Sequence, residues 1–350
     1  MTWVHAQGPK ADLRVSQEAH ARALRKLGPL PKLPPTKGML RLYETMLRIR
    51  AFEDRAWRAA SKGEALPIHP SSGHEAIAVG VCSLLTRRDK VISNHRPFGH
   101  FIAKGGSLRA LMAELFGKAT GVCKGLGGEM FLSEPSIGFV LSSMMVGSCM
   151  TLATGVGLAL KMSGSKSVAA CFFGDAASTN GAFHEALTMA ALYKVPVLFV
   201  CENNGYSTNS PAMEYMPTGM VVDRAKEYGF PAVAVDGTDV LAVRDATQRA
   251  MWHIAHNHTP YFLEALVSRM GPHKQILVDS RDEDRKTYAR MRDPIVRFRA
   301  SLLAEGMLTQ SLDDAIKGRV GKQVENAVRF ARRGAPLAES DLSRYLYVNP

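Results

Sequence analysis

Two short polar stretches stand where apolar runs of the sequence stop. Gly174-Asp175 follows the run from Val168 to Phe173, and Asn203-Asn204 comes soon after the run from Val195 to Cys201. A carboxylate, an amide oxygen and a turn carbonyl form an all-oxygen ligand set suited to Mg²⁺, an ion that commonly holds the phosphates of a ligand. Taken alone, Asp175 could instead be the N-cap of a helix and the asparagines an ordinary turn.

The segment between these stretches indicates how they could meet. Residues 183–193 show a helical pattern, so that strand, small-residue turn, helix and strand follow one another as a βαβ unit. In a parallel sheet both strands end at the same edge, where open α/β folds bind their ligands. The sequence therefore predicts one site for a metal and a diphosphate at this edge.

The same residues resemble a known signature. Gly174-Asp175-Ala176, with Asn204 standing 29 positions after Asp175, resembles the thiamine diphosphate motif of Gly-Asp-Gly and a later Asn-Asn pair. The resemblance implies that Mg²⁺ is bound by Asp175, by the side chain of Asn204 and by the main-chain carbonyl of Tyr206. It also implies that the turn Gly174, Asp175, Ala176 and Ala177 binds the cofactor. Ala176 departs from the motif, which has a glycine at this position. A glycine has easy access to positive φ, and an alanine does not.

Two segments nearer the N-terminus extend the resemblance to one family. Residues 46–56, MLRIRAFEDRA, are similar to the first core helix of the alpha subunit of thiamine-dependent 2-oxo acid dehydrogenases. His69, followed by Gly73 and His74-Glu75-Ala76, resembles the family segment His-x-x-x-Gly-Gln-Glu-Ala. An isolated histidine is more often structural, but this match implies that His69 is a catalytic histidine that contacts the substrate. His74 replaces the family's glutamine.

Two basic segments resemble the family's cofactor contacts. His95-Arg96 stands where the family has an aromatic residue or a histidine and an arginine on the diphosphate, and a guanidinium offers a planar fork of donors that suits phosphate. Arg269 and His273 resemble an Arg-x-x-x-His loop at the mouth of the cofactor site. The match implies that His273 touches the diphosphate or the proton-transfer path. Lys274 and the residues after it depart from the family's serine, so regulation of the loop by phosphorylation is not supported.

Other positions depart from the family more strongly. Residues 144–147, Met-Met-Val-Gly, stand where the family has Gly-Ile-Val-Gly, and the match implies that backbone groups of Met144 and Val146 contact the aminopyrimidine. A methionine in place of glycine would narrow the pocket. In the glycine-rich segment before it, Glu129 and Phe131 occupy the places of a serine and a histidine. The polar contacts that the family makes there are therefore in doubt.

Composition limits the remaining possibilities. The net charge is +12, but the basic residues are spread along the chain, and we expect a phosphate-bearing cofactor and an acidic protein partner rather than nucleic acid. The chain is 46% hydrophobic and 22% charged, and no apolar run reaches the roughly 18 residues of a membrane span. Five cysteines without C-x-x-C spacing favour a reducing compartment. We expect a cytoplasmic protein.

Alternating helices and strands predict an α/β fold with a doubly wound, mostly parallel sheet flanked by helices and followed by a helical tail. By the resemblance this is a thiamine diphosphate-binding fold. We expect an N-terminal arm over residues 1–36, the diphosphate and Mg²⁺ domain over residues 37–300 and the helical tail over residues 301–350.

The resemblance implies the alpha subunit of an enzyme that decarboxylates a 2-oxo acid, or cleaves acetoin, and passes the acyl group to a lipoyl carrier. A separate beta subunit would supply the activating glutamate within an α₂β₂ heterotetramer, and a lipoyl acyltransferase would be a further partner. Two alternatives stay open. One is a two-subunit carboligase or transketolase-like enzyme without a lipoyl partner, and the other is a non-catalytic paralogue whose cofactor site is blocked by Ala176 and Met144. The sequence does not identify the substrate.

Overall fold

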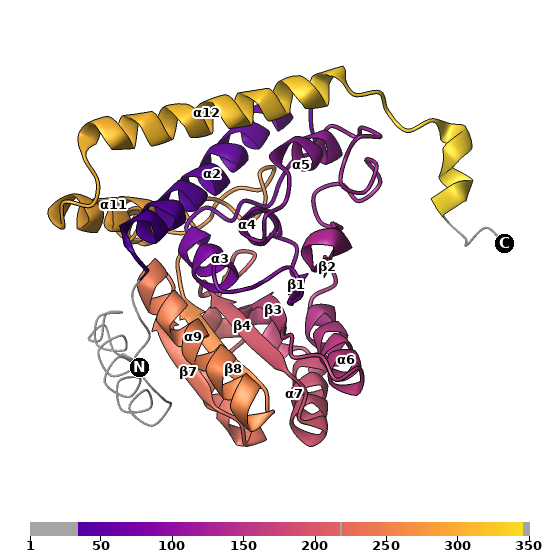
Figure 1. Cartoon of the computed structure of the whole chain (residues 1–350), viewed down its shortest axis with the longest axis vertical. Helices are drawn as coiled ribbons and strands as arrows, with labels where there is room; N and C mark the ends of the chain where they lie inside the picture. The colour runs from indigo at the N-terminus through magenta and orange to yellow at the C-terminus, as the bar shows by residue number, and fades with distance from the viewer. Residues whose placement is uncertain (1–33, 218, 346–350) are drawn as a thin grey trace.

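The computed structural model describes residues 34–217 and 219–345. Its centre is a six-stranded sheet in the order β2-β1-β3-β4-β8-β7, with every neighbouring pair parallel (Figure 1). The strands are β1 (Lys90–Ser93), β2 (Phe139–Ser142), β3 (Ala169–Gly174), β4 (Val197–Asn203), β7 (Ala232–Asp236) and β8 (Tyr261–Leu266). A short antiparallel pair, β5 (Tyr206–Ser207) and β6 (Ser210–Pro211), lies beyond the end of β4. The predicted α/β fold is confirmed.

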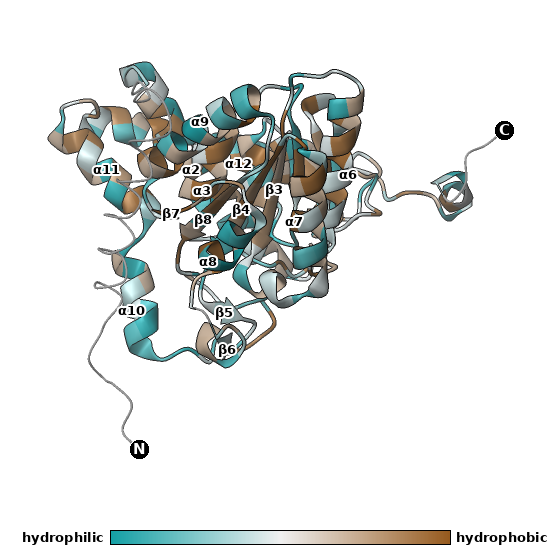
Figure 2. Ribbon diagram, turned by 90° about the horizontal axis from the view of Figure 1, so that it is seen from below, coloured by the Kyte–Doolittle hydropathy of each residue, from teal (hydrophilic) through white to brown (hydrophobic). Residues whose placement is uncertain are grey.

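The central strands are apolar on both faces because helices cover both. On β3, Ala170 and Phe172 belong to one buried cluster, whereas Cys171 and Phe173 belong to another. This matches the near-continuous hydrophobic runs expected of parallel strands. In Figure 2 the strands are brown and lie between helices that carry teal, hydrophilic residues.

The helices divide between the two clusters. The larger cluster includes residues of α2 (Thr36–Ala60), α3 (Glu75–Cys82), α4 (Phe98–Ala103), α5 (Leu108–Leu115), α9 (Val240–Asn257), α11 (Pro294–Ala304) and α12 (Gln310–Arg333). The smaller cluster includes residues of α6 (Ser148–Met162), α7 (Gly181–Tyr193) and α8 (Val221–Ala225). The short α10 (Glu283–Met291) connects the sheet to the C-terminal helices.

The predicted βαβ unit is present as β3, α7 and β4, with one difference. The turn after β3 is a 3₁₀ helix, η2 (Asp175–Thr179), and Asn180 begins α7 by accepting a hydrogen bond from the Ala182 amide. Asn203, predicted to follow β4, is instead its last residue and pairs with Leu266 of β8. Only Asn204 therefore lies beyond the strand.

The C-terminal helices pack back on the N-terminal part of the described chain. Figure 1 shows α12 lying along α2, and α12 also contacts α5. The last element, η5 (Glu339–Tyr345), projects away from the body in the same view. The predicted arm of residues 1–36 falls almost entirely outside the described residues, and the three domain boundaries stay predictions. No helix in the described part of the chain is both long and apolar enough to cross a membrane.

Candidate active site

A cavity of about 800 Å³ lies at the carboxyl ends of β1, β3 and β4. This is the edge at which ligands bind to open parallel sheets. Every residue predicted for the site lines this cavity: His69, His95, Arg96, Met144, Val146, Gly174, Asp175, Ala176, Ala177, Asn204, Tyr206 and His273. The structure thus brings the predicted residues together, while their individual roles stay predictions.

One corner of the cavity gathers the oxygen atoms proposed as metal ligands. Asp175 is buried, and its Oδ1 accepts a hydrogen bond from the Asn204 amide at 3.3 Å. The Asn204 side-chain oxygen accepts from the Tyr206 amide at 3.1 Å, which folds the chain tightly after β4. Tyr215, which the sequence did not single out, donates its hydroxyl to Asp175 Oδ2 at 2.5 Å. Burial raises the pKa of Asp175, and this hydrogen bond opposes the rise.

This corner differs from a cluster of acidic and imidazole ligands. In the described ranges, no group of three His, Cys, Asp or Glu side chains could hold a metal ion. The predicted Mg²⁺ ligands contain only one carboxylate, and the other two donors are an amide and a main-chain carbonyl. A hard cation that keeps several waters suits such a set.

The alanine that departs from the signature causes no backbone strain. Ala176 lies within η2 and is not among the residues with positive φ, so the glycine of the family motif is not needed for that conformation. Gly147, in contrast, has φ of 97°, and a Cβ added there would lie 3.0 Å from Asn180 Cγ. The backbone that requires a glycine is therefore at the start of α6, not at Ala176.

Arg96 is the buried cation of the cavity. Its guanidinium donates to the Pro70 carbonyl, to the His273 carbonyl at 3.0 Å and, across 3.2 Å, faces His273 Nδ1. Burial, with the nearby charge of Arg269, lowers the pKa of Arg96 to about 9. The side chain is thus cationic at neutral pH, as an anchor for phosphate must be.

Three imidazole rings surround this cation. The ring centroids of His69, His95 and His273 lie 5.1, 5.1 and 5.5 Å apart. Burial, and then the charge of Arg96, lowers the pKa of His273 to about 3 and that of His95 well below its ordinary value. Both rings are therefore neutral at pH 7. His95 Nε2 is buried and has no hydrogen-bond partner among the described residues, which suits a polar ligand in the cavity.

His69 is held by Glu129, which drew attention in the sequence only because it replaces the family's serine. Glu129 Oε2 accepts from the His69 amide at 2.7 Å, and Oε1 lies 3.1 Å from His69 Nδ1. Lys274 Nζ forms an ion pair with the same Oε1 at 3.0 Å. Burial favours a higher pKa for Glu129, but His69 and Lys274 outweigh it and hold the pKa below its usual range.

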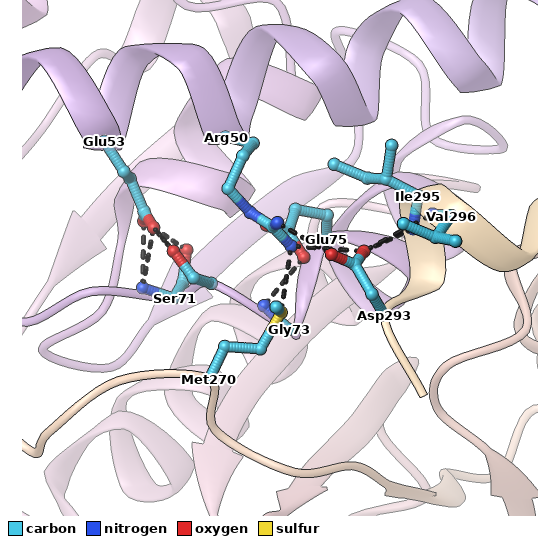
Figure 3. Close-up of polar contacts among 10 residues, drawn as sticks. Arg50, Glu53, Ser71, Gly73, Glu75, Met270, Asp293, Ile295 and Val296 are labelled. Carbon is cyan, nitrogen blue, oxygen red and sulfur yellow. Dashed lines mark hydrogen bonds and ion pairs between the residues drawn. The ribbon is translucent and has the colours of Figure 1, made fainter. Parts of the chain in front are cut away.

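The backbone from His69 to Glu75 is tied to α2 by two charged side chains, as Figure 3 shows. Glu53 accepts from the Ser71 amide at 2.9 and 3.0 Å, and burial raises the pKa of Glu53 to about 7. Arg50 forms ion pairs with Glu75 at 2.5 Å and with Asp293 at 3.0 Å. Asp293 is also the N-cap of α11. The segment carrying His69 is thus held by two side chains of α2, one of which is also paired with the start of α11.

A second acidic residue missed by the sequence reading lies at the base of the cavity. Glu202 of β4 accepts from Asn94 Nδ2 at 2.7 Å and lies 3.2 Å from His74 Nδ1 and 3.3 Å from His100 Nε2. Burial would raise the pKa of Glu202, but the two histidines hold it well below the ordinary value. Within the described part of the chain, His74 Nε2 is buried and has no hydrogen-bond partner. The available signal in the sequence was a charged residue directly after an apolar run, together with a histidine that replaces the motif's glutamine.

Met144 and Val146 form a wall of the cavity just before α6, and their exposed fractions are 49% and 56%. The Val146 carbonyl accepts from Asn180 Nδ2 at 3.2 Å. Asn180 thus begins α7 and also supports the loop that was predicted to contact the aminopyrimidine.

Asn203 does not line the cavity. Its side chain donates to Glu264 at 2.6 Å, and Glu264 also accepts from the first two amides of α8.

Together these residues could bind a polyanion and exchange protons with a ligand. The cavity contains the oxygen atoms predicted to bind a metal, a buried arginine, Arg96, and beside that arginine the neutral imidazole of His273. Neutral imidazoles accept or relay protons near neutral pH. The remaining wall is apolar, with Met130, Met144, Val146 and Leu277.

Comparisons with known proteins give a consistent result. The family model described as dehydrogenase E1 component matches residues 43–338. The chain is 38% identical over 312 residues to the alpha subunit of acetoin:2,6-dichlorophenolindophenol oxidoreductase of Bacillus subtilis (strain 168), covering 88% of this chain and 93% of the relative. It is 33% identical to the pyruvate dehydrogenase E1 component subunit alpha of Porphyra purpurea, covering 89% and 93%. The corresponding subunit of Rhizobium meliloti (strain 1021) is 34% identical, covering 86% of each chain.

Proposed function

The chain belongs to the dehydrogenase E1 component family, and we propose that it is the alpha subunit of a thiamine diphosphate-dependent enzyme that decarboxylates a 2-oxo acid or cleaves acetoin. The relatives named above are alpha subunits of pyruvate and acetoin dehydrogenases. The strongest structural support is that all the residues predicted to bind the cofactor or Mg²⁺, or to act in catalysis, line one cavity at the carboxyl edge of the sheet.

The cavity fits the cofactor in size and in the chemistry of its donors. About 800 Å³ lies within the range of small-molecule sites. Arg96 supplies a buried cation for the diphosphate, and His95 Nε2 is a buried polar atom that lacks a partner. We propose that Asp175, the Asn204 side chain and the Tyr206 carbonyl would hold Mg²⁺, which would offset the negative charge of the diphosphate. We further propose that Met144 and Val146 contact the aminopyrimidine.

When bound, thiamine diphosphate supplies the nucleophilic carbon and the electron sink of the reaction. The chain's own residues bind and orient the cofactor and the substrate. Arg96 fixes the anionic end of the ligand, and the buried segment of His69 and Ser71 excludes water on its side of the cavity. The rings of His69 and His273 lie on the same side of the cavity, with their centroids 5.1 Å apart. We assign the proton transfers of the reaction to these two rings.

A beta subunit completes the enzyme in this proposal. It would supply the activating glutamate in an α₂β₂ assembly, and a lipoyl acyltransferase would accept the acyl group. The outer sides of α6 and α7 carry exposed apolar side chains, including Leu152, Met162 and Leu192 with exposed fractions of 43%, 79% and 72%. Exposed apolar surface of this kind supports a protein partner. The five free cysteines support a cytoplasmic location.

A non-catalytic paralogue fits the structure less well. That alternative required Ala176 and Met144 to block the cofactor, but Ala176 has an unstrained backbone and Met144 lines an open cavity. Neither residue therefore closes the site.

The proposed function is tested by combining the purified chain with its candidate beta subunit, thiamine diphosphate and Mg²⁺. Reduction of 2,6-dichlorophenolindophenol is then followed with pyruvate, with branched-chain 2-oxo acids and with acetoin. We expect dye reduction with at least one substrate and none when either subunit is omitted. Condensation of two substrates without dye reduction would instead identify a carboligase, and the absence of any reaction would contradict the proposal.

A further inference from the structure

Two positions that depart from the family motifs meet each other in the structure. Glu129 stands where the family has a serine, in the loop after α5, and Lys274 replaces a serine in the loop after β8. Their side chains form an ion pair at 3.0 Å, in which Glu129 is 5% exposed. Loops separated by 145 positions thus share one buried contact at the cavity, and His69 completes it.

The carboxylate of Glu129 contacts both the backbone and the ring of His69. The His69 amide can only donate, so it fixes Oε2 as its acceptor at 2.7 Å. Oε1 then faces ring Nδ1 at 3.1 Å. An unprotonated Nδ1 would place its lone pair against a carboxylate oxygen, and the low pKa of Glu129 keeps that group ionised. The proton of a neutral His69 ring therefore belongs on Nδ1.

The opposite ring nitrogen then has a defined role. His69 lines the cavity, and no hydrogen bond between described residues uses its Nε2. With Nδ1 protonated, Nε2 carries a lone pair and can accept a hydrogen bond or a proton. The same logic governs histidines whose second nitrogen is held by a carboxylate in other sites.

We propose that Glu129 is a positioning residue that holds His69 in the Nδ1-protonated form and so presents Nε2 to the ligand as a proton acceptor. Lys274 supports this arrangement, because it balances the buried carboxylate and joins the loop after β8 to it. The inference rests on the proposed function only for the identity of the ligand, which is the substrate bound beside the cofactor. The tautomer itself is a property of the chain alone.

Other charged and titratable groups near His69 do not replace Glu129 in this role. His95 and His273 contact the ring edge to face at centroid distances of 5.1 Å, and both are neutral. Arg96 donates to the Pro70 carbonyl rather than to His69. Glu129 is therefore the group that can select one tautomer.

The tautomer can be measured without cofactor by nitrogen NMR of the full chain labelled with ¹⁵N-histidine, in which His69→Asn identifies the His69 signals. We expect the wild-type ring to be protonated on Nδ1. Glu129→Ser restores the family's residue but cannot reach the ring, and Glu129→Met fills the space without an oxygen acceptor. Both variants should lose the Nδ1 preference. Glu134→Met, in the same loop, is the matched control, because Glu134 contacts Ser136 rather than a histidine.

Kinetics with the beta subunit provide the second readout. A proton acceptor that is wrongly protonated should lower kcat, roughly tenfold or more, with little change in KM. Glu129→Asp, which keeps the carboxylate, should recover part of that loss, and Glu134→Met should leave kcat unchanged. An unchanged His69 tautomer in both Glu129 variants would overturn the proposal, as would a kcat equal to that of the wild type.

The two proposals fail in different ways. If the complex turns over no 2-oxo acid or acetoin while the NMR signals change as expected, the proposed function is wrong and the positioning role of Glu129 stands. If the wild-type complex is active but His69 is protonated on Nε2, the proposed function stands and the role of Glu129 is wrong.

Discussion

Asp175 connects the sequence motif to the geometry of the cavity more directly than any other residue. It directly follows β3, accepts a hydrogen bond from the Asn204 amide beyond the end of the neighbouring strand and accepts another from the Tyr215 hydroxyl. A buried carboxylate that accepts from neutral donors such as these has remaining lone pairs for a cation. Burial also raises its pKa, so a bound cation would stabilise the ionised form.

Replacement of Asp175 by alanine should therefore abolish Mg²⁺-dependent binding of thiamine diphosphate, because the metal loses its one charged ligand. Calorimetric titration of the variant, in the presence of the beta subunit, measures this loss. Asp223→Ala is a suitable control, because the Asp223 side chain on α8 is exposed and forms a surface ion pair with Lys226. An affinity of Asp175→Ala equal to that of the wild type would mean that the metal site has been misplaced.

The histidines of the cavity predict a pH dependence of stability. The pKa of His273 falls to about 3 in the folded chain through burial and the charge of Arg96, against about 6.5 for an unfolded histidine. Between these values the unfolded chain binds a proton that the folded chain does not, so the free energy of unfolding decreases as the pH falls from about 6.5 towards 3.

His273→Asn should consequently lose less stability than the wild type between pH 7 and pH 5 when no cofactor is present. Urea unfolding at both pH values measures the difference for each protein, and only the change with pH is compared. Equal losses in the two proteins would show that His273 is not held neutral by its surroundings.

At the scale of elements, Arg50 on α2 holds together parts of the chain that are distant in sequence. It pairs with Glu75 at the start of α3 and with Asp293 at the start of α11 (Figure 3). Removal of one partner from a buried ion pair leaves an uncompensated charge and typically costs about 3–5 kcal/mol. Removal of the Arg50 guanidinium would leave two carboxylates, those of Glu75 and Asp293, without this cation.

We therefore expect Arg50→Met to lower the free energy of unfolding by about 3 kcal/mol or more. Arg48→Met is the control two residues earlier on α2, because Arg48 is more exposed and pairs with Glu44 on the same helix, a contact worth at most about 1 kcal/mol. Chemical denaturation of both variants gives the comparison. A similar small effect of the two substitutions would contradict the anchoring role of Arg50.

The start of α6 provides a second test at this scale. Gly147 has φ of 97°, and a Cβ there would press on Asn180, so Gly147→Ala should destabilise the protein by about 1–3 kcal/mol. A Cβ at Gly155, on the same helix, meets no atom within 4 Å. Gly155→Ala should therefore be neutral or stabilising, by up to about 1 kcal/mol. Thermal unfolding would contradict this if the two variants shifted in the same direction.

The elements themselves could largely be predicted from the sequence, because apolar runs and helical spacing report burial directly. The unit of β3, α7 and β4 was expected with the correct order and direction. Asn203 was misplaced because chain pairing, not side-chain type, decides where β4 stops: its neighbour Leu266 extends the ladder by one more residue. Glu264 accepts a hydrogen bond from the Asn203 side chain, and no local sequence pattern predicts this contact.

The candidate site was predictable to the extent that its residues stand in motifs. Asp175, Asn204 and Arg96 are recognised by type and spacing, whereas Glu129, Glu202 and Tyr215 act through contacts between segments far apart in the chain. Glu129 was noticed only as a departure from a serine. The role of Glu129 depends on its ion pair with Lys274 in the loop after β8. The sequence alone does not show that these two loops meet.

At the scale of the whole molecule, the cavity is one side of a larger proposed site. The described chain supplies oxygen ligands, a buried arginine and neutral histidines along the sheet edge. In the proposed enzyme the activating glutamate comes from the beta subunit, so the single chain should be inactive by itself. The exposed apolar side chains of α6 and α7 are consistent with a molecule that functions in a complex.

Calorimetric titration of thiamine diphosphate into the chain, with and without its candidate beta subunit and with and without Mg²⁺, tests the proposed shared cofactor site most directly. We predict tight binding only when both the beta subunit and Mg²⁺ are present. Failure to bind in the presence of both would contradict the proposed function.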